Sequence, residues 1–263
     1  MTPPFLSRRA GRPLRAQCGW LHRTALAGLL CAALVPAPAG AGEANSVHIL
    51  QAGDRGRADV TQSGTGSVRV EQAGLGQTAR ITQIGQGNAL RLSQDGRSNT
   101  ATAGIVGDGN TFSLEQRGDD NLMSLTVIGD DNGLGLGSLV QRGRANLIDL
   151  GLTGSGNDVM LMQEGRDNAV AAVVSGDANT LSLSQDGQGN DARVSQRGRG
   201  HSASLGQRDR GNSLVLDQSG AANAARVLQQ GGGNSLTLIQ QGTGLARQIT
   251  QTGGMTATVR MSN

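Results

Sequence analysis

From residue 45 onward, hydrophobic and polar residues alternate in short runs that recur along the chain. In residues 179–196 (NTLSLSQDGQGNDARVSQ), Leu181, Leu183 and Gln185 alternate with small polar residues. A period of two places one set of side chains on one face of a β-strand and the other set on the opposite face. The run stops at DGQG and begins again at Asn190. The pattern predicts an eleven-residue unit, a strand of about seven residues and a turn of about four.

The spacing of the repeats indicates how the units stack. Glutamine ends the strand in 15 of 19 units, and the other four strand ends are Ile105, Val127, Leu152 and Val174. These four occupy every second unit, as they would in a coil of two strands per turn, where they form one column. We therefore predict an all-β fold, a β-solenoid of about ten two-strand rungs with two parallel sheets face to face across a thin core. Rungs spaced by about 4.8 Å would give a body close to 50 Å long.

The same inward-facing positions carry glutamine and asparagine. A buried amide without a partner costs a few kcal/mol, but amides stacked at rung spacing can donate to one neighbour and accept from the other. We expect such structural ladders from the glutamines at strand ends and from the asparagines that open the next strands. The glutamines are Gln83, Gln94, Gln116, Gln141, Gln163, Gln185, Gln196, Gln207, Gln218, Gln229 and Gln240. The asparagines are Asn88, Asn99, Asn110, Asn121, Asn132, Asn146, Asn157, Asn168, Asn179, Asn190, Asn212, Asn223 and Asn234.

The turns repeat as faithfully as the strands. A glycine stands two residues after each strand end, with Asp209 as the one exception. This predicts a positive φ or a closely packed backbone at each corner. The turn glycines of the clearest units are Gly85, Gly96, Gly118, Gly165, Gly187, Gly198, Gly220 and Gly231. Three additional residues between Asn132 and Gln141 predict a bulge or small loop, and Arg247 falls on an inward-facing position near the end.

The first 41 residues have a different composition. Five arginines and no acidic residue precede an apolar run from residue 25 to 35, and Ala39 and Ala41 have the spacing of an A-x-A cleavage site. We predict a secretory signal peptide over residues 1–41, cut after Ala41, and a repeat domain over residues 42–263. A transmembrane anchor is disfavoured because the apolar run is far shorter than the roughly 20 residues needed to span a bilayer.

Cleavage at this point would change the chemistry of the chain. Cys18 and Cys31 would leave with the signal peptide, so the mature chain would have no disulfide, thiolate nucleophile or cysteine metal site. The formal charge of +3 would become −2, with 18 basic against 20 acidic residues. The basic balance therefore belongs mostly to the targeting segment, and we expect no nucleic-acid partner.

The repeats resemble a known family. Residues 83–94 (QIGQGNALRLSQ) and 229–240 (QQGGGNSLTLIQ) look like the curlin repeat of the curli subunits, the bacterial functional amyloids. The resemblance covers essentially the whole mature chain. It implies secretion through a dedicated outer-membrane pore with chaperones, then polymerisation at the bacterial cell surface into a pilus-type fibre. It also implies roles in adhesion and biofilm matrix, with partners that are further copies and other curlin-repeat subunits. The many repeats and scarce aromatics leave open a major or a nucleating minor subunit.

Other functions have less support in the residues. His48 lies on an outward position and His201 in an asparagine position, and neither has a placed Ser, Cys or acidic partner, so we expect no enzyme activity, substrate or cofactor. The acidic turns at residues 107–110, 118–121 and 129–132 could bind calcium, but they lack nonapeptide spacing, and Asp is common in turns. A monomeric solenoid that binds ice or polysaccharide is a further alternative. It would call for aligned Thr columns or exposed aromatics, which the outward positions lack.

Overall fold

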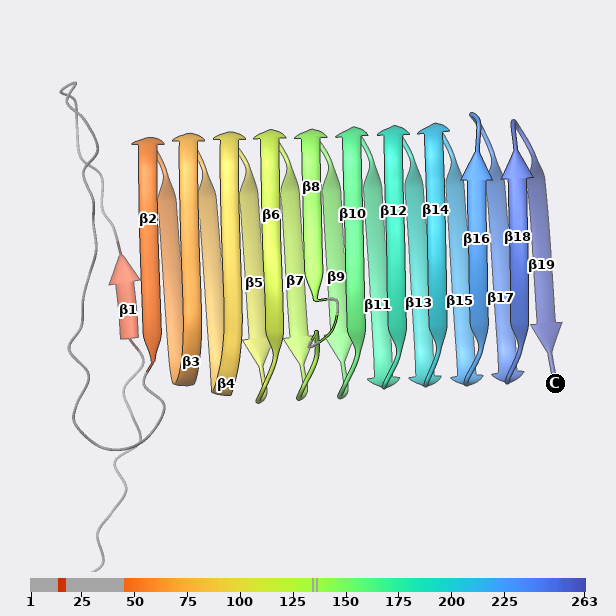
Figure 1. Cartoon of the computed structure of the whole chain (residues 1–263), viewed down its shortest axis with the longest axis horizontal. Helices are drawn as coiled ribbons and strands as arrows, with labels where there is room; N and C mark the ends of the chain where they lie inside the picture. The colour runs from red at the N-terminus through yellow and green to blue at the C-terminus, as the bar shows by residue number, and fades with distance from the viewer. Residues whose placement is uncertain (1–13, 18–44, 134, 136) are drawn as a thin grey trace, which may run out of the picture.

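The computed structural model describes residues 14–17, 45–133, 135 and 137–263. From residue 46 the chain winds as a continuous coil of about ten turns, each turn contributing one strand to each of two sheets (Figure 1). This confirms the predicted all-β solenoid. The part of the chain that is described contains no helix, and so none long and apolar enough to cross a membrane.

Two sheets of parallel strands form the body. Sheet 1 contains β2 (Ser46–Asp54), β6 (Thr111–Asp119), β8 (Ser138–Arg144), β10 (Asp158–Arg166), β12 (Thr180–Gln188), β14 (Ser202–Arg210), β16 (Ala224–Gln230) and β18 (Ala246–Thr252). Sheet 2 contains β5 (Thr100–Val106), β7 (Leu122–Ile128), β9 (Leu147–Thr153), β11 (Ala169–Asp177), β13 (Asp191–Arg199), β15 (Ser213–Ala221), β17 (Ser235–Thr243) and β19 (Thr256–Ser262). β3 (Arg57–Leu75) and β4 (Thr78–Arg97) each pass through a turn, from sheet 2 into sheet 1.

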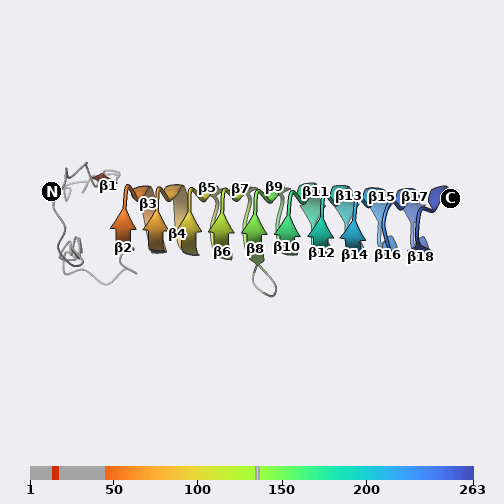
Figure 2. The ribbon, with the colours of Figure 1, turned by 90° about the horizontal axis from the view of Figure 1, so that it is seen from above.

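Strands two units apart in the sequence lie side by side. Gln163 of β10 pairs with Gln185 of β12, and in most of the body the partners are 22 residues apart, twice the eleven-residue unit. Identical positions of the repeat therefore form columns along the solenoid. Figure 2 shows the two sheets as thin layers facing each other along the whole length.

The core lies between these layers. Inward side chains such as Leu92, Leu114 and Leu183 are buried, whereas the intervening positions of the same strands are exposed or half-buried. Ile105, Val127, Leu152 and Val174 align in one column of sheet 2, as the two-strand coil requires. All four are buried, and we call them the aliphatic block.

The register changes at the places where the repeat is irregular. The pairing of β3 with β4 shifts between Gly64 and Gly66, in the unit that is one residue short. Gln116 and Gln141 are 25 residues apart, and the additional residues lie between Asn132 and Ser138, outside the strands. At the end, Ser235 pairs with Thr256, a spacing of 21. Insertions and deletions are thus absorbed in turns, and the inward columns stay aligned.

The predicted signal peptide and its boundary lie outside the described residues, apart from β1 (Leu14–Gln17). β1 pairs antiparallel with residues 59–62 of β3. It therefore lies along the outer edge of sheet 2 at the N-terminal end of the solenoid.

Candidate functional site

An uninterrupted ladder of glutamine side chains runs through sheet 1. In each of nine consecutive pairs, Nε2 of the earlier glutamine donates a hydrogen bond of 2.6–3.0 Å to Oε1 of the later one. Its members are Gln51, Gln72, Gln94, Gln116, Gln141, Gln163, Gln185, Gln207, Gln229 and Gln251. The ladder spans the whole solenoid, from β2 to β18.

Each interior amide of this ladder is satisfied on both sides. Gln94 Nε2, for example, donates to Gln116 Oε1 at 2.7 Å and to the backbone oxygen of Thr78 at 3.1 Å, and Gln94 Oε1 accepts from Gln72. Burying a polar group is tolerated when its hydrogen bonds are made. The bond to the start of the opposite strand also holds the corner between the sheets. The repeat therefore places one fully partnered amide inside every turn of the coil.

The corresponding column of sheet 2 is broken. Gln196, Gln218 and Gln240 form a short ladder with bonds of 2.9 and 2.8 Å, but the aliphatic block precedes it. Gln196 Oε1 is consequently buried without a partner. At the other side of the block, Gln83 Nε2 donates to the backbone of Asn88 while Gln83 Oε1 has no partner, and Gln62 has none for either amide atom. The structure therefore brings Gln83 into line with the column without linking it to another glutamine.

The asparagines form two further ladders, in which the direction of donation is reversed. Asn110 donates from its backbone nitrogen (2.9 Å) and from Nδ2 (3.0 Å) to Oδ1 of Asn88, one turn earlier. Asn110 Nδ2 also donates to the backbone oxygen of Gly129 at 2.8 Å. One column contains Asn88, Asn110, Asn132, Asn157, Asn179 and Asn223, and the other contains Asn99, Asn121, Asn146, Asn168, Asn190, Asn212 and Asn234.

His201 takes an asparagine position in the first of these columns. Its backbone nitrogen donates to Asn179 Oδ1 at 2.9 Å, and its Nδ1 accepts from the backbone nitrogen of Asn223 at 3.3 Å. Nε2 lies 3.0 Å from the backbone oxygen of Arg197. His201 is buried, and all of these partners belong to the ladder and its turn. The hydrogen bonds of the His201 side chain therefore support a structural role in the asparagine column.

The turn glycines have the backbone geometry that the repeats demand. All eight singled out in the sequence have a positive φ, from 75° at Gly231 to 129° at Gly187. At Gly165, where φ is 113°, an added Cβ would overlap the backbone oxygen of Gly187 in the next turn. Close stacking of successive corners therefore requires glycine there.

The acidic turns use their carboxylates to hold the neighbouring turn. Asp108 Oδ1 accepts from the backbone nitrogen of Gln86 at 2.7 Å, and Asp130 Oδ1 accepts from that of Asp108 at 2.8 Å. Asp177 does the same for Ser155 at 3.0 Å. Within the described residues, no group of three or more His, Cys, Asp or Glu side chains is arranged to hold a metal ion. These hydrogen bonds between turns were not predicted from the sequence. The recurrence of Asp in equivalent turns is the sequence feature that could have indicated them.

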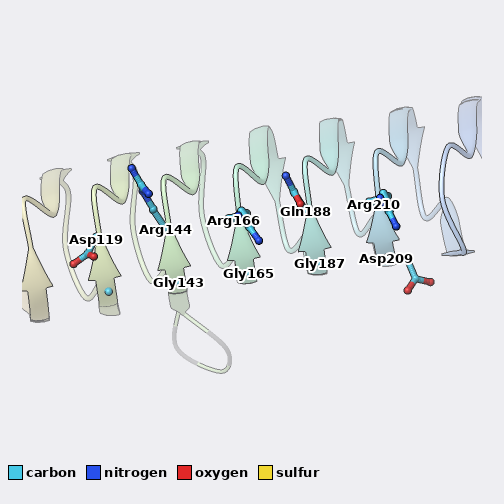
Figure 3. A pocket seen from close by; sticks show the side chains of 10 residues that line it. Asp119, Gly143, Arg144, Gly165, Arg166, Gly187, Gln188, Asp209 and Arg210 are labelled. Atoms are coloured by element: carbon cyan, nitrogen blue, oxygen red, sulfur yellow. The ribbon is translucent and has the colours of Figure 1, made fainter.

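A shallow hollow follows the turns of sheet 1. It is lined at successive turns by Asp119, Arg144, Arg166, Gln188 and Arg210, whose side chains project from the corners (Figure 3). All of these residues except Asp119 are exposed. Arg144 Nε lies 3.8 Å from Oδ2 of Asp120. The row contains no nucleophile paired with a base, so it gives no support to a catalytic site.

The two ends of the solenoid differ from its interior. The N-terminal end consists of β2 and the first half of β3, and the C-terminal end of β18 and β19. Inward aliphatic side chains of β2, β18 and β19 are only partly buried, including Val47, Ile49, Ile249 and Val259, whereas Ala58 and Val60 of β3 are buried. The edges of β2, β18 and β19 can pair with another strand, whereas the edge of β3 at the N-terminal end is paired with β1 over residues 59–62.

Comparison with known proteins identifies the repeat. The family model described as curlin associated repeat matches the chain three times, at residues 85–118, 176–208 and 210–242. No curated protein matches the chain.

Proposed function

This chain is a curlin-repeat protein, and we propose that it is a structural subunit of extracellular curli-like amyloid fibres. Its repeats and its β-solenoid fold suit a curli-type structural subunit, and the curlin-repeat family is structural rather than enzymatic. We accordingly propose no catalytic residue and no cofactor for it.

The observation that carries the proposal is the sheet 1 ladder, which reaches both ends of the molecule. A stack of identical amides and parallel strands can be extended by further turns, because each turn presents the same donors, acceptors and apolar contacts to the next one. Gln51 and Gln251 are its terminal members, and each lacks one of the two glutamine neighbours that interior members have. Addition of a second copy at an end would supply the missing neighbour and pair the open strand edge.

The proposed location and partners follow from the family. We propose that the chain is secreted, with residues 1–41 removed, and that it polymerises at the bacterial cell surface for adhesion and biofilm matrix. Its partners would be further copies and other curlin-repeat subunits, with an outer-membrane pore and chaperones for export. The ladder glutamines and asparagines would be the structural residues of the fibre.

Incubation of the purified chain 42–263 tests this proposal. We expect a lag, then fibrils visible by electron microscopy that bind an amyloid dye, and removal of the lag by preformed fragments. A chain that stays monomeric and dispersed for days, even with fragments present, contradicts the proposal and favours the solenoid that binds ice or polysaccharide. Fibre formation without a lag, together with seeding of another curlin-repeat protein, would indicate a nucleating minor subunit.

A further inference from the structure

One inward-facing position at the C-terminal end is occupied by a charged residue. Arg247 of β18 pairs in register with Ala225 of β16, which is buried in the core. The other described strands of this column carry Val47, Val68, Leu90, Phe112, Val159, Leu181, Ala203 and Ala225. Arg247 is exposed because β18 is the last strand of sheet 1. Among the described residues, no other inward-facing strand position holds an arginine, an aspartate or a glutamate.

The path of the coil determines how a second copy would fit on this end. In the chain β18 precedes β19, and β2 precedes β3. The coil therefore continues without a missing strand only when β2 of the added copy lies on β18 and the first half of its β3 lies on β19. The edge of β3 is open to this contact once residues 1–41, which include β1, are removed. The opposite placement, with β2 on β19, would leave the edge of β18 unpaired.

The glutamine ladder then sets the register. An interior member such as Gln116 donates to two backbone oxygens and to the next glutamine. Gln251 makes the two backbone bonds, to Ser235 and Met255 at 3.1 Å each, but has no glutamine after it. Gln51 is the first member, with Oε1 facing away from Gln72. Stacking Gln51 on Gln251 continues the ladder with the same direction of donation as in all nine internal bonds.

This register brings similar residues together at most inward positions; in sheet 2 the exception is Gln62, which would lie on Met261. Ile49 lies on Ile249 in sheet 1, and in sheet 2 Ala58 lies on Ala257 and Val60 on Val259. Val47, however, lies on Arg247. A guanidinium enclosed against an aliphatic side chain loses its hydration without gaining a partner, which is unfavourable unless a carboxylate is present.

We propose that copies of this chain join head to tail in this register, and that Arg247 limits the junction by placing an unpaired charge inside it. The inference rests on the proposed function and adds the residue that controls it. Arg247 keeps the C-terminal end hydrated in the free chain, as inward-pointing charges do at sheet edges. The end is thereby selective for an incoming first strand that carries a carboxylate at the position of Val47.

A cycle of four chains tests this: the natural chain, Arg247→Leu, Val47→Glu, and the double variant. The measurement is the concentration of soluble chain left at equilibrium with fibres, together with the elongation rate from identical fragments. Arg247→Leu should lower the residual concentration roughly tenfold or more, because the buried charge is gone. Val47→Glu should lower it while Arg247 is present and raise it when Arg247→Leu is already in place. That reversal of sign is the signature of direct contact.

Arg260→Leu is the matched control, because Arg260 lies on β19 at the same end but on an outward, exposed position. It should change the residual concentration less than about twofold. Equal effects of Arg247→Leu and Arg260→Leu, or a Val47→Glu effect of the same sign in both backgrounds, would overturn the inference while leaving fibre formation intact. Absence of fibres in all chains, even with fragments, would instead remove the proposed function and this inference together.

Discussion

The two sheets fill the inward-facing position at the strand end in different ways. Sheet 1 carries ten glutamines in one uninterrupted ladder, whereas sheet 2 replaces four of them by the aliphatic block between Gln83 and Gln196. The aliphatic block leaves Oε1 of Gln196 without a partner, and before the block Gln62 and Gln83 are not linked to each other, whereas every interior amide of sheet 1 is linked. A buried amide column is therefore stable as a contiguous run, and its cost is concentrated at its ends. An aliphatic column has no such requirement.

The largest effect should come from cutting the sheet 1 ladder. Gln185→Leu removes an amide that accepts from Gln163 and donates to Gln207 at 2.7 Å. It leaves one side-chain donor and one side-chain acceptor unsatisfied, at about 1–3 kcal/mol each, and removes the 2.9 Å bond to the backbone oxygen of Ala169. We expect the free energy of unfolding to fall by about 2–5 kcal/mol, read from denaturant unfolding and from faster amide exchange in β10 to β14.

The neighbouring unit supplies the comparison for this variant. Gln196→Leu deprives Gln218 of its donor but also removes an oxygen that already lacks a partner. The number of unsatisfied side-chain acceptors is unchanged, and only the 3.2 Å bond to the backbone oxygen of Thr180 is lost in addition, so the cost should be about 1 kcal/mol. Equal losses at both positions would show that ladder continuity has no energetic role.

An amide placed in the middle of the aliphatic block should have the next largest effect. Val127→Gln would face Ile105 and Leu152, neither of which can accept or donate. We expect a loss of about 1–3 kcal/mol in unfolding free energy. Val174→Gln makes the same chemical change beside Gln196, whose free Oε1 could accept its amide hydrogen. It should cost about 1 kcal/mol less than Val127→Gln, and the reverse order in calorimetry would argue against this account.

The asparagine columns also allow a continuous column to be compared with an interrupted one, with a smaller expected effect. His201 interrupts one column, whereas the column from Asn99 to Asn234 is continuous. His201→Asn would let Asn223 donate to a side-chain oxygen as other members do. We expect a gain of up to about 1 kcal/mol, measured as a rise in the denaturation midpoint. Asn190→His, in the continuous column, is the counterpart and should lower it.

The smallest effect concerns the surface. Arg69 hydrogen-bonds Glu71 at 2.6 Å, and this bond, with the charges of Arg69 and Arg91, holds the pKa of the Glu71 carboxyl below its usual range. Because the pKa is lowered on folding, the stabilisation is present at neutral pH and is lost as the pH falls below about 4 through the folded pKa. A carboxyl titration followed by NMR should show the pKa of Glu71 rising in Arg69→Gln, and an unchanged pKa would argue against this contact.

Much of this architecture can be predicted from the repeat alone. The alternation of apolar and polar residues predicts the strands, and the recurring glycines predict the corners. The placement of Ile105 and Val127 in every second unit predicts two strands per turn of the coil. These features can be predicted because side-chain periodicity and turn geometry are local properties. The curlin resemblance of residues 83–94 and 229–240 is likewise confirmed by the family match. The ladders themselves were expected from the polarity of inward positions, since buried amides need partners.

What the sequence by itself determined is which residues share a column, since a fixed period brings equal positions together whatever the surroundings. Only the tertiary structure decided which atoms meet within a column. It decided that glutamines donate toward the C-terminus and asparagines toward the N-terminus, that Gln83 and Gln196 each keep an unpartnered oxygen, and that Asp108 holds the turn of Gln86. These depend on the orientation of amides and carboxylates across neighbouring turns. Such orientation is set by packing between distant segments and not by periodicity.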